Sequence, residues 1–197
     1  MTISEVKDTT GNPGPLGLMG FGMTTVLLNL HNAGLFALDS MILAMGIFYG
    51  GIAQVIAGIM AWRKGNTFAA TAFTSYGSFW LTFVALLLLP GYSDIAVTAT
   101  PDSVAWASYL LMWALFTGVM LIGTLRLNRA LQFIFGSLTI LFILLAIAKI
   151  TGEPLIGQIA GVEGIICGFS AVYTGLAEAL NDVYGRVVAP LFPVRKI

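Results

Sequence analysis

The sequence predicts an all-α integral membrane protein, a single bundle of six transmembrane helices. Of its 197 residues, 58% are hydrophobic and only 9% are charged, whereas about 25% of the residues of an average soluble domain are charged. Six apolar segments have the roughly 20 residues that a helix needs to cross the hydrocarbon core of a bilayer. None alternates like the strands of a membrane β-barrel. The segments are Leu16–Leu35, Met41–Trp62, Phe68–Leu89, Val104–Leu125, Ala130–Ile150 and Leu155–Leu180.

The first segment follows a proline-rich stretch that begins at Asn12 and contains Pro13 and Pro15. Proline is tolerated in the first turn of a helix, because the N–H that it lacks would have no partner there. The side-chain oxygen of an asparagine can accept a hydrogen bond from the free N–H groups of a helix start. The stretch therefore predicts a defined helix start, with an ordinary proline-containing loop as the alternative.

Turn-forming residues separate the remaining segments. Gly65-Asn66 lies between the second and third segments, and Pro90-Gly91 and Pro101-Asp102 bound the connection from the third to the fourth. Arg126–Arg129 joins the fourth to the fifth, and Thr151–Pro154 separates the last two. The six helices are thus expected to follow one another through short connections.

Lysine and arginine fall almost entirely on one side of this predicted topology. Short cytoplasmic loops collect these residues, so both termini are expected in the cytoplasm. Residues 1–11 and 186–197 are then polar cytoplasmic tails, and residues 12–185 form the transmembrane domain. Only Lys149 lies near the other side; the remaining cations are Lys7, Arg63, Lys64, Arg126, Arg129, Arg186, Arg195 and Lys196.

Several classes of function are disfavoured by the sequence. Nine Lys and Arg residues balance nine Asp and Glu residues, so no basic field indicates a nucleic-acid partner. The single cysteine, Cys167, excludes an internal disulfide and a multi-cysteine metal site. The sequence contains no Walker loop, zinc-protease motif or nucleophile-elbow motif. We therefore expect no enzyme, cofactor or metal, and instead a small passive or ion-coupled conductor or a structural membrane protein.

Small residues recur every three or four positions in the second and last segments, which places them on one helix face. Such faces permit the close helix contacts that are common in lipid. One interpretation is packing within or between protomers, and the other is that a stripe leaves space for a narrow pore. The stripes are Gly46, Gly50, Ala53 and Ala57, and Gly157, Gly161, Gly164, Gly168, Ala171 and Gly175.

Uncharged polar residues within the spans are few, and lipid would leave them without partners, so they should face the bundle or a pathway. Hydrogen bonds between helices are the alternative role for the amides, and hydroxyls also bond to their own helix. The candidates are Thr25, Asn29, Asn32 and Gln54, and a stripe of Thr71, Ser75, Ser78 and Thr82.

Glu163 is the acidic residue deepest in a predicted span. It follows Leu155 by eight residues, which corresponds to about 12 Å along a helix, near the middle of the bilayer. An ionised carboxylate is costly there, so Glu163 is expected to be protonated, paired or hydrated. Its role is either a proton-linked or gating carboxyl, or a structural hydrogen bond to a neighbouring helix. His31, near the end of the first span, is expected to be structural, with pH sensing as the alternative.

The stretch from Asn12 to Leu18, NPGPLGL, resembles the signature of the acetate uptake transporter family, which includes the bacterial succinate–acetate permeases. The resemblance continues through residues 19–32, 44–54, 65–68 and 71–80. Gly14 stands where the signature usually has Ala or Val. The signature residues here are Asn12, Pro13, Pro15, Leu16, Gly17 and Leu18.

This resemblance implies six helices per protomer, a homo-hexameric ring in the bacterial inner membrane and a separate pathway through each protomer. It implies acetate and succinate as substrates. It also implies an apolar constriction formed by Phe21, Tyr76 and Leu138, with Ala171 affecting the size of the substrate.

An apolar constriction cannot replace the hydration of a carboxylate, whose idealised transfer into a low-dielectric medium costs on the order of 20 kcal/mol. The acid can cross in its protonated form, or the constriction can open so that groups such as Asn29, Ser75 and the Tyr76 hydroxyl solvate the anion. We expect proton-linked uptake of acetate, with succinate and other small carboxylates as further candidate substrates. The alternatives are a passive anion channel, a channel for neutral solutes such as urea, and a purely structural oligomer.

Overall fold

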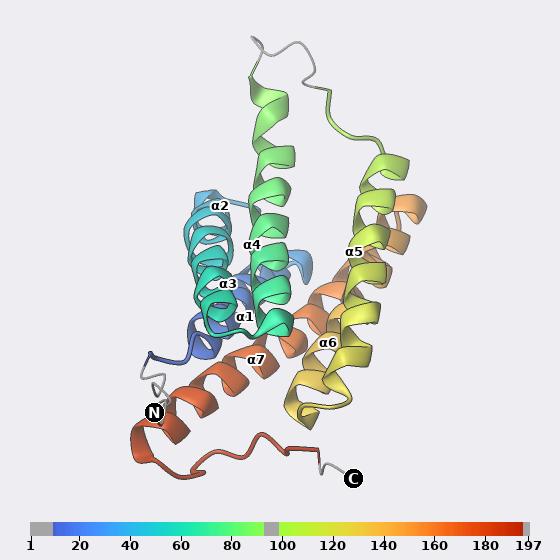
Figure 1. The fold of residues 1–197 in the computed structure, drawn as a ribbon. Helices are drawn as coiled ribbons and strands as arrows, with labels where there is room; N and C mark the ends of the chain where they lie inside the picture. Colours follow the sequence, from blue (N-terminus) through green and yellow to red (C-terminus); the bar gives the residue numbers. More distant parts are fainter. Residues whose placement is uncertain (1–9, 93–98, 195–197) are drawn as a thin grey trace, which may run out of the picture.

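The computed structural model describes residues 10–92 and 99–194, and these residues form long helices packed side by side (Figure 1). The sequence prediction of an all-α membrane fold is confirmed, and the predicted segments differ from the observed helices by only a few residues at their ends. The elements are α1 (Gly14–Asn32), α2 (Ser40–Ala44), a π-helical segment (Met45–Ala53), α3 (Gln54–Arg63), α4 (Thr67–Leu88), a 3₁₀ turn (Leu89–Gly91), α5 (Ser103–Thr124), α6 (Arg129–Thr151) and α7 (Pro154–Tyr184).

The helices begin where the turn residues predict. The side chain of Asn66 accepts from the backbone N–H of Ala69 at 3.0 Å and starts α4. Asp102 caps α5 in the same way, at 2.7 Å from the backbone nitrogen of Ala105. Such caps satisfy N–H groups that have no partner within the helix. The turns are therefore encoded by local chemistry as well as by the ends of the apolar runs.

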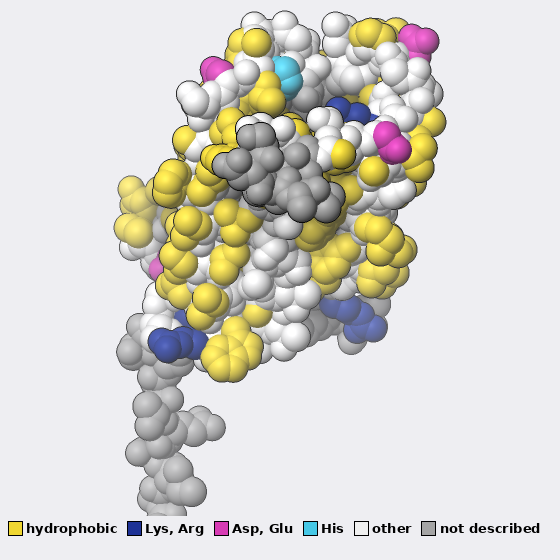
Figure 2. Space-filling view, turned by 90° about the horizontal axis from the view of Figure 1, so that it is seen from above, with side chains coloured by type: hydrophobic (Ala, Val, Ile, Leu, Met, Phe, Trp, Pro, Cys, Tyr) yellow, Lys and Arg dark blue, Asp and Glu magenta, His cyan; other side chains and the backbone are white. Residues whose placement is uncertain are grey.

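Within the described residues, five helical stretches are long and apolar enough to cross a membrane: Ser40–Arg63, Thr67–Gly91, Ser103–Thr124, Arg129–Thr151 and Pro154–Tyr184. The remaining predicted span, α1, has 19 residues, and ten of them are buried. Protein rather than lipid surrounds much of this helix, so it tolerates the amides and the histidine near its end. Large apolar side chains cover much of the outer surface of the protein (Figure 2), as expected for contact with lipid.

The π-helical segment changes which residues of the second span are buried. The spacing of three and four predicts Gly46, Gly50, Ala53 and Ala57 on one helix face. In the structure the adjacent glycines Gly50 and Gly51 are both buried, and Ala53 is only partly buried. A π-helix has wider turns than an α-helix, so the inner face shifts along the sequence. Gln54, the first residue of α3, is consequently buried with 1% of its surface exposed.

The glycine stripe of α7 packs against α1. A Cβ atom added at Gly168 would lie 2.8 Å from the backbone nitrogen of Val26, and one added at Gly22 would lie 2.8 Å from the carbonyl oxygen of Gly168. The backbones of the two helices therefore approach too closely for a side chain at either position. Gly157, at the start of the same stripe, faces open space. Between α1 and α7 the stripe serves helix packing, which was the first of its two interpretations.

Residues 186–194, within the predicted tail 186–197, cross the end of the bundle that carries both termini (Figure 1). The carbonyl of Phe192 accepts from the backbone N–H of Arg129 at 2.9 Å, and the backbone N–H of Val194 donates to the carbonyl of Leu127 at 3.0 Å. The first contact satisfies an N–H group at the start of α6 that the helix itself leaves free. The segment thus acts as a strap that fixes the start of α6. Lys7, Arg195 and Lys196 lie outside the described residues.

Candidate transport pathway

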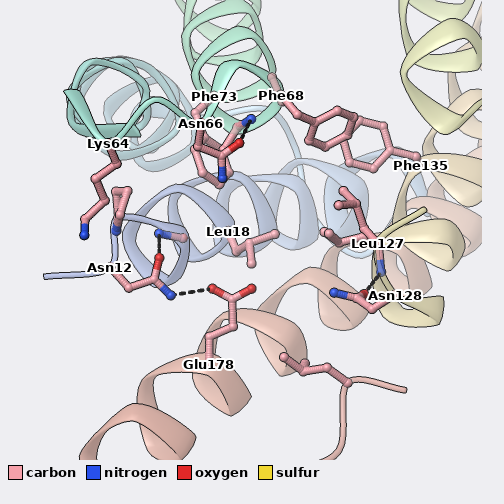
Figure 3. Close-up of a pocket in the computed structure, with 16 residues that line it drawn as sticks. Asn12, Leu18, Lys64, Asn66, Phe68, Phe73, Leu127, Asn128, Phe135 and Glu178 are labelled. Carbon is pink, nitrogen blue, oxygen red and sulfur yellow. Dashed lines mark hydrogen bonds between the residues drawn. The ribbon is translucent and has the colours of Figure 1, made fainter. Parts of the chain in front are cut away.

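Three cavities follow one another through the protomer. The first, the terminal-end cavity, lies at the end that carries the termini and has a volume of about 610 Å³. Figure 3 shows that it lies between the start of α1, the start of α4, α7 and the α5–α6 turn. Its wall includes Asn12, Leu18, Lys64, Asn66, Phe73, Asn128, Phe135 and Glu178. It forms a wide, partly polar vestibule.

The second, the central cavity, has a volume of only about 20 Å³. It shares Leu18, Ala72, Phe73 and Phe135 with the terminal-end cavity, so the two are neighbours along one path. A water molecule needs about 10–15 Å³ of such volume, which leaves room for about one water and none for a carboxylic acid. The path is closed here. The other lining residues are Phe21, Gln54, Tyr76, Ile134 and Leu138.

The structure brings the three predicted constriction residues together at this cavity. Phe21, Tyr76 and Leu138 come from α1, α4 and α6 and are 5%, 4% and 3% exposed. The ring centroids of Phe21 and Tyr76 are 5.8 Å apart. The hydroxyl of Tyr76 donates to the hydroxyl of Thr117 at 3.0 Å. The contact with Thr117 on α5 fixes the orientation of the ring that closes the path.

The third, the opposite-end cavity, has a volume of about 160 Å³. Phe79 lines it, one helical turn beyond Tyr76 on α4. The ring of Phe79 makes edge contacts with Trp113 and Phe142, each at 5.2 Å between centroids. These rings form a second aromatic barrier that was not predicted from the sequence; the recurrence of aromatic residues at positions 76, 79 and 83 is the sequence signal that indicates it. The other lining residues are Leu28, His31, Asn32, Leu38, Phe83, Leu87, Trp106, Leu110, Leu145 and Lys149.

Gln54 is the candidate polar residue that reaches the central cavity. Its side-chain oxygen is buried and has no hydrogen-bond partner in the described part of the protein. Buried polar groups normally have partners, so this amide can receive a water or a substrate. An amide both donates and accepts, which matches a protonated carboxylic acid.

The predicted polar face of α1 is mostly used within the protein. The side chain of Asn32 donates to the side-chain oxygen of Asn29 at 2.9 Å, and Asn29 donates to the carbonyl of Thr25 at 2.9 Å. Asn29 occupies the notch at Gly164 on α7, away from the three cavities. The Thr25 hydroxyl is buried without a hydrogen-bond partner among the described residues. Of these residues, Asn32 alone belongs to the walls of the three cavities described above.

The hydroxyl stripe of α4 faces away from the path. Thr71, Ser78 and Thr82 are exposed, and Ser75 is partly buried. The Ser78 hydroxyl donates to the carbonyl of Thr74 at 2.9 Å, which is the helix-backbone role open to such residues. Ser75 does not belong to the walls of the three cavities.

Glu163 lies where α7 meets α6. The hydroxyl of Ser137 donates to one carboxyl oxygen of Glu163, and the other oxygen is buried without a partner among the described residues. Ser137 precedes Leu138, so the carboxyl lies at the level of the constriction but outside the cavity walls. Ala171, on the same helix, is completely buried and also does not line the three cavities.

The signature residues shape the vestibule (Figure 3). The side-chain oxygen of Asn12 accepts from the backbone N–H of Gly14 at 2.9 Å, and its nitrogen donates to the Glu178 carboxyl at 3.1 Å. A Cβ atom at Gly14 would collide with this carboxyl. Pro13 immediately precedes α1 and Pro15 lies in its first turn, as expected for a helix start. Asn12 therefore starts α1 and joins it to α7.

Substitution of Gly17 by alanine is expected to lower flux severalfold in a folded protein. A Cβ atom at Gly17 would lie 2.5 Å from the ring of Phe73, and Phe73 lines both the terminal-end and central cavities. The ring of Phe73 must move, and the space next to it is that of the two cavities, so the displaced ring narrows the path. Gly14→Ala is the control, because only the ends of the Glu178 and Asn12 side chains must move. Equal flux in the two variants, measured in proteoliposomes, would contradict this role of Gly17.

The described residues contain no group of three or more His, Cys, Asp or Glu side chains that could hold a metal ion. The path is lined instead by aromatic rings, aliphatic side chains, amides and a few charged groups at its two ends. Such a lining suits small, weakly polar molecules, and it offers no cluster suited to metal chemistry.

Known proteins resemble this chain in sequence and in structure. The chain is 58% identical over 180 residues to the succinate-acetate/proton symporter SatP of Escherichia coli, covering 91% of this chain and 94% of the relative. It is 34% identical over 195 residues to acetate permease A of Emericella nidulans, covering 91% and 65%. The solved structure of the bacterial acetate channel SatP superposes with a TM-score of 0.89 at 57% identity, covering 93% of this chain and 99% of that one. The sequence model of the GPR1/FUN34/yaaH family matches residues 2–196. This chain is a member of the GPR1/FUN34/yaaH family.

Proposed function

We propose that the protein carries acetate, and also succinate, across the bacterial inner membrane through a pathway in each protomer, coupled to protons. It acts as a homo-hexamer with both termini in the cytoplasm, and it is not an enzyme. The names of the relatives, a succinate-acetate/proton symporter and an acetate channel, support acetate and succinate as the substrates. The positions of Arg63, Lys64, Arg126, Arg129 and Arg186 at the end with the termini support the orientation, because cytoplasmic loops collect cations.

The observation that carries the proton coupling is the uncharged lining of the central cavity. Its wall contains eight aliphatic or aromatic residues and one amide, Gln54, and no Lys, Arg, Asp or Glu. A bare carboxylate would lose its hydration here at a cost of several kcal/mol even after relaxation. A neutral acid avoids this cost, and its hydroxyl and carbonyl match the acceptor and donor of the Gln54 amide.

The test is the flux of labelled acetate in proteoliposomes with the pH gradient and the membrane voltage varied separately. We expect an inward proton gradient to drive accumulation and voltage to have little effect when the pH gradient is zero. Flux that follows voltage and ignores the pH gradient would contradict proton coupling and indicate a passive anion channel. Labelled urea flux that acetate does not inhibit would instead support a channel for neutral solutes.

The anion channel is the second candidate, and one observation favours it. Lys149 lines the opposite-end cavity, so the path does include a cation at one mouth. An anion held there would still have to pass Phe79 and the constriction. The measurements with separate pH gradient and voltage separate the two mechanisms, whereas Gln54→Leu should slow both, because the amide N–H groups would also bind a carboxylate.

A further inference from the structure

Two cavities meet at the end of the bundle opposite the termini. The opposite-end cavity and a neighbouring cavity of about 350 Å³ share Asn32, Leu145 and Lys149 in their walls. The neighbouring cavity extends over the α6–α7 turn to Glu153. Lys149 therefore stands at the junction between the open mouth and the aromatic interior.

The ammonium group of Lys149 lies 5.3 Å from the ring centroid of Trp106. Within the part of the chain that the structure describes, Lys149 forms no ion pair with a carboxylate, and it is the sole Lys or Arg at this end. A cation–π contact supplies no counter-ion to an ammonium. The Lys149 ammonium is thus able to accept an anion.

Most of the other groups at the junction are suited to the same ligand, and one, the carboxylate of Glu153, opposes it. The titratable groups that face it are His31 in the opposite-end cavity and Glu153 in the neighbouring one. Nδ1 of His31 donates to the carbonyl of Phe36 at 2.9 Å, which leaves Nε2 as the other ring nitrogen. Asn32 uses one amide hydrogen on Asn29 and has a second to donate. Phe79 and Leu110 supply an apolar wall.

We propose that this junction is a capture site for the carboxylate of the substrate, ahead of the aromatic barrier. The ammonium of Lys149 and the amide of Asn32 bind the carboxylate, and the hydrocarbon part of the acid lies against Phe79 and Leu110. The inference rests on the proposed function and adds a specific binding step to it. Because Coulomb attraction scales with charge, Lys149 favours a dicarboxylate over a monocarboxylate at this step.

The test compares Lys149→Gln and Lys149→Arg in uptake of labelled acetate and succinate, at low and high ionic strength. At low ionic strength, Lys149→Gln is expected to raise the KM for acetate about fivefold, the factor for one charge contact in a wet mouth, and the KM for succinate more, with Vmax unchanged. Salt screens such contacts, so the difference should shrink at high ionic strength. Lys149→Arg keeps the charge and should behave like the wild type.

Glu153→Gln provides a control in which the expected change in KM has the opposite sign. Its carboxylate faces the same mouth, so its removal should lower the KM or leave it unchanged. An unchanged KM in Lys149→Gln, with normal yield in size-exclusion chromatography and active wild type, would overturn the capture site alone. A wild type that carries neither acid would contradict the proposed function, and the capture site with it.

Discussion

Replacement of Leu138 by valine is expected to let the protein carry lactate, with an increase of about tenfold in the ratio of lactate to acetate flux. Leu138 is 3% exposed and lines a central cavity of about 20 Å³ together with Phe21 and Tyr76. One methylene in an apolar pocket is worth about tenfold or more in discrimination between substrates. Removing it at the narrowest point relaxes the size limit where the acid must pass.

The measurement is uptake of labelled lactate and acetate in proteoliposomes, with Leu141→Val as the matched control. Leu141 is on the same helix and equally buried, but it does not line the three cavities. Ala171→Gly is expected to have a smaller effect, since Ala171 is packed away from these cavities. Equal gains in Leu138→Val and Leu141→Val would show that looser packing, and not the width of the constriction, sets selectivity.

The fold follows from the sequence because lipid imposes simple rules. Each span must be about 20 apolar residues long, and each loop is marked by residues with a local role, such as Asn66 and Asp102, which cap α4 and α5. The strap of residues 186–194 could not be predicted in this way. Its contacts join carbonyls such as that of Phe192 to the start of α6, and backbone contacts between distant segments leave no pattern in the side chains.

The candidate site was less accessible to physical reasoning from the sequence. Phe21, Tyr76 and Leu138 meet from three helices, and no periodicity links them; only the resemblance to a family indicated them. A polar side chain within a span was also an incomplete guide to the path. Asn29 contacts its own helix and Gly164, and Ser75 lies outside the cavity walls. Which face of a helix looks into the path depends on its neighbours, and the π-helical turn before Gln54 shifts that face further.

Gly168→Val is expected to give the largest loss of stability, because the obstacles around Gly168 are mainly backbone. A Cβ atom there would lie 2.8 Å from the nitrogen of Val26 and 2.9 Å from the carbonyl oxygen of Gly22. A side chain can change its rotamer, but these atoms move only if α1 and α7 separate. Overpacking of a core usually costs about 1–3 kcal/mol, and a forced separation of two helices should reach the upper end of that range or exceed it.

The effect on function should follow from the same displacement. Phe21, which precedes Gly22 on α1, closes the central cavity, so a shift of α1 away from α7 moves a wall of the constriction. Thermal unfolding of the detergent-solubilised protein should therefore occur at a lower temperature, with a lower yield. Gly157→Val is the control, because Gly157 belongs to the same stripe on α7 and nothing lies within 4 Å of its added Cβ atom. If both variants lost stability equally, the loss would come from placing valine within α7. Close contact between α1 and α7 would then not explain the loss of stability in Gly168→Val.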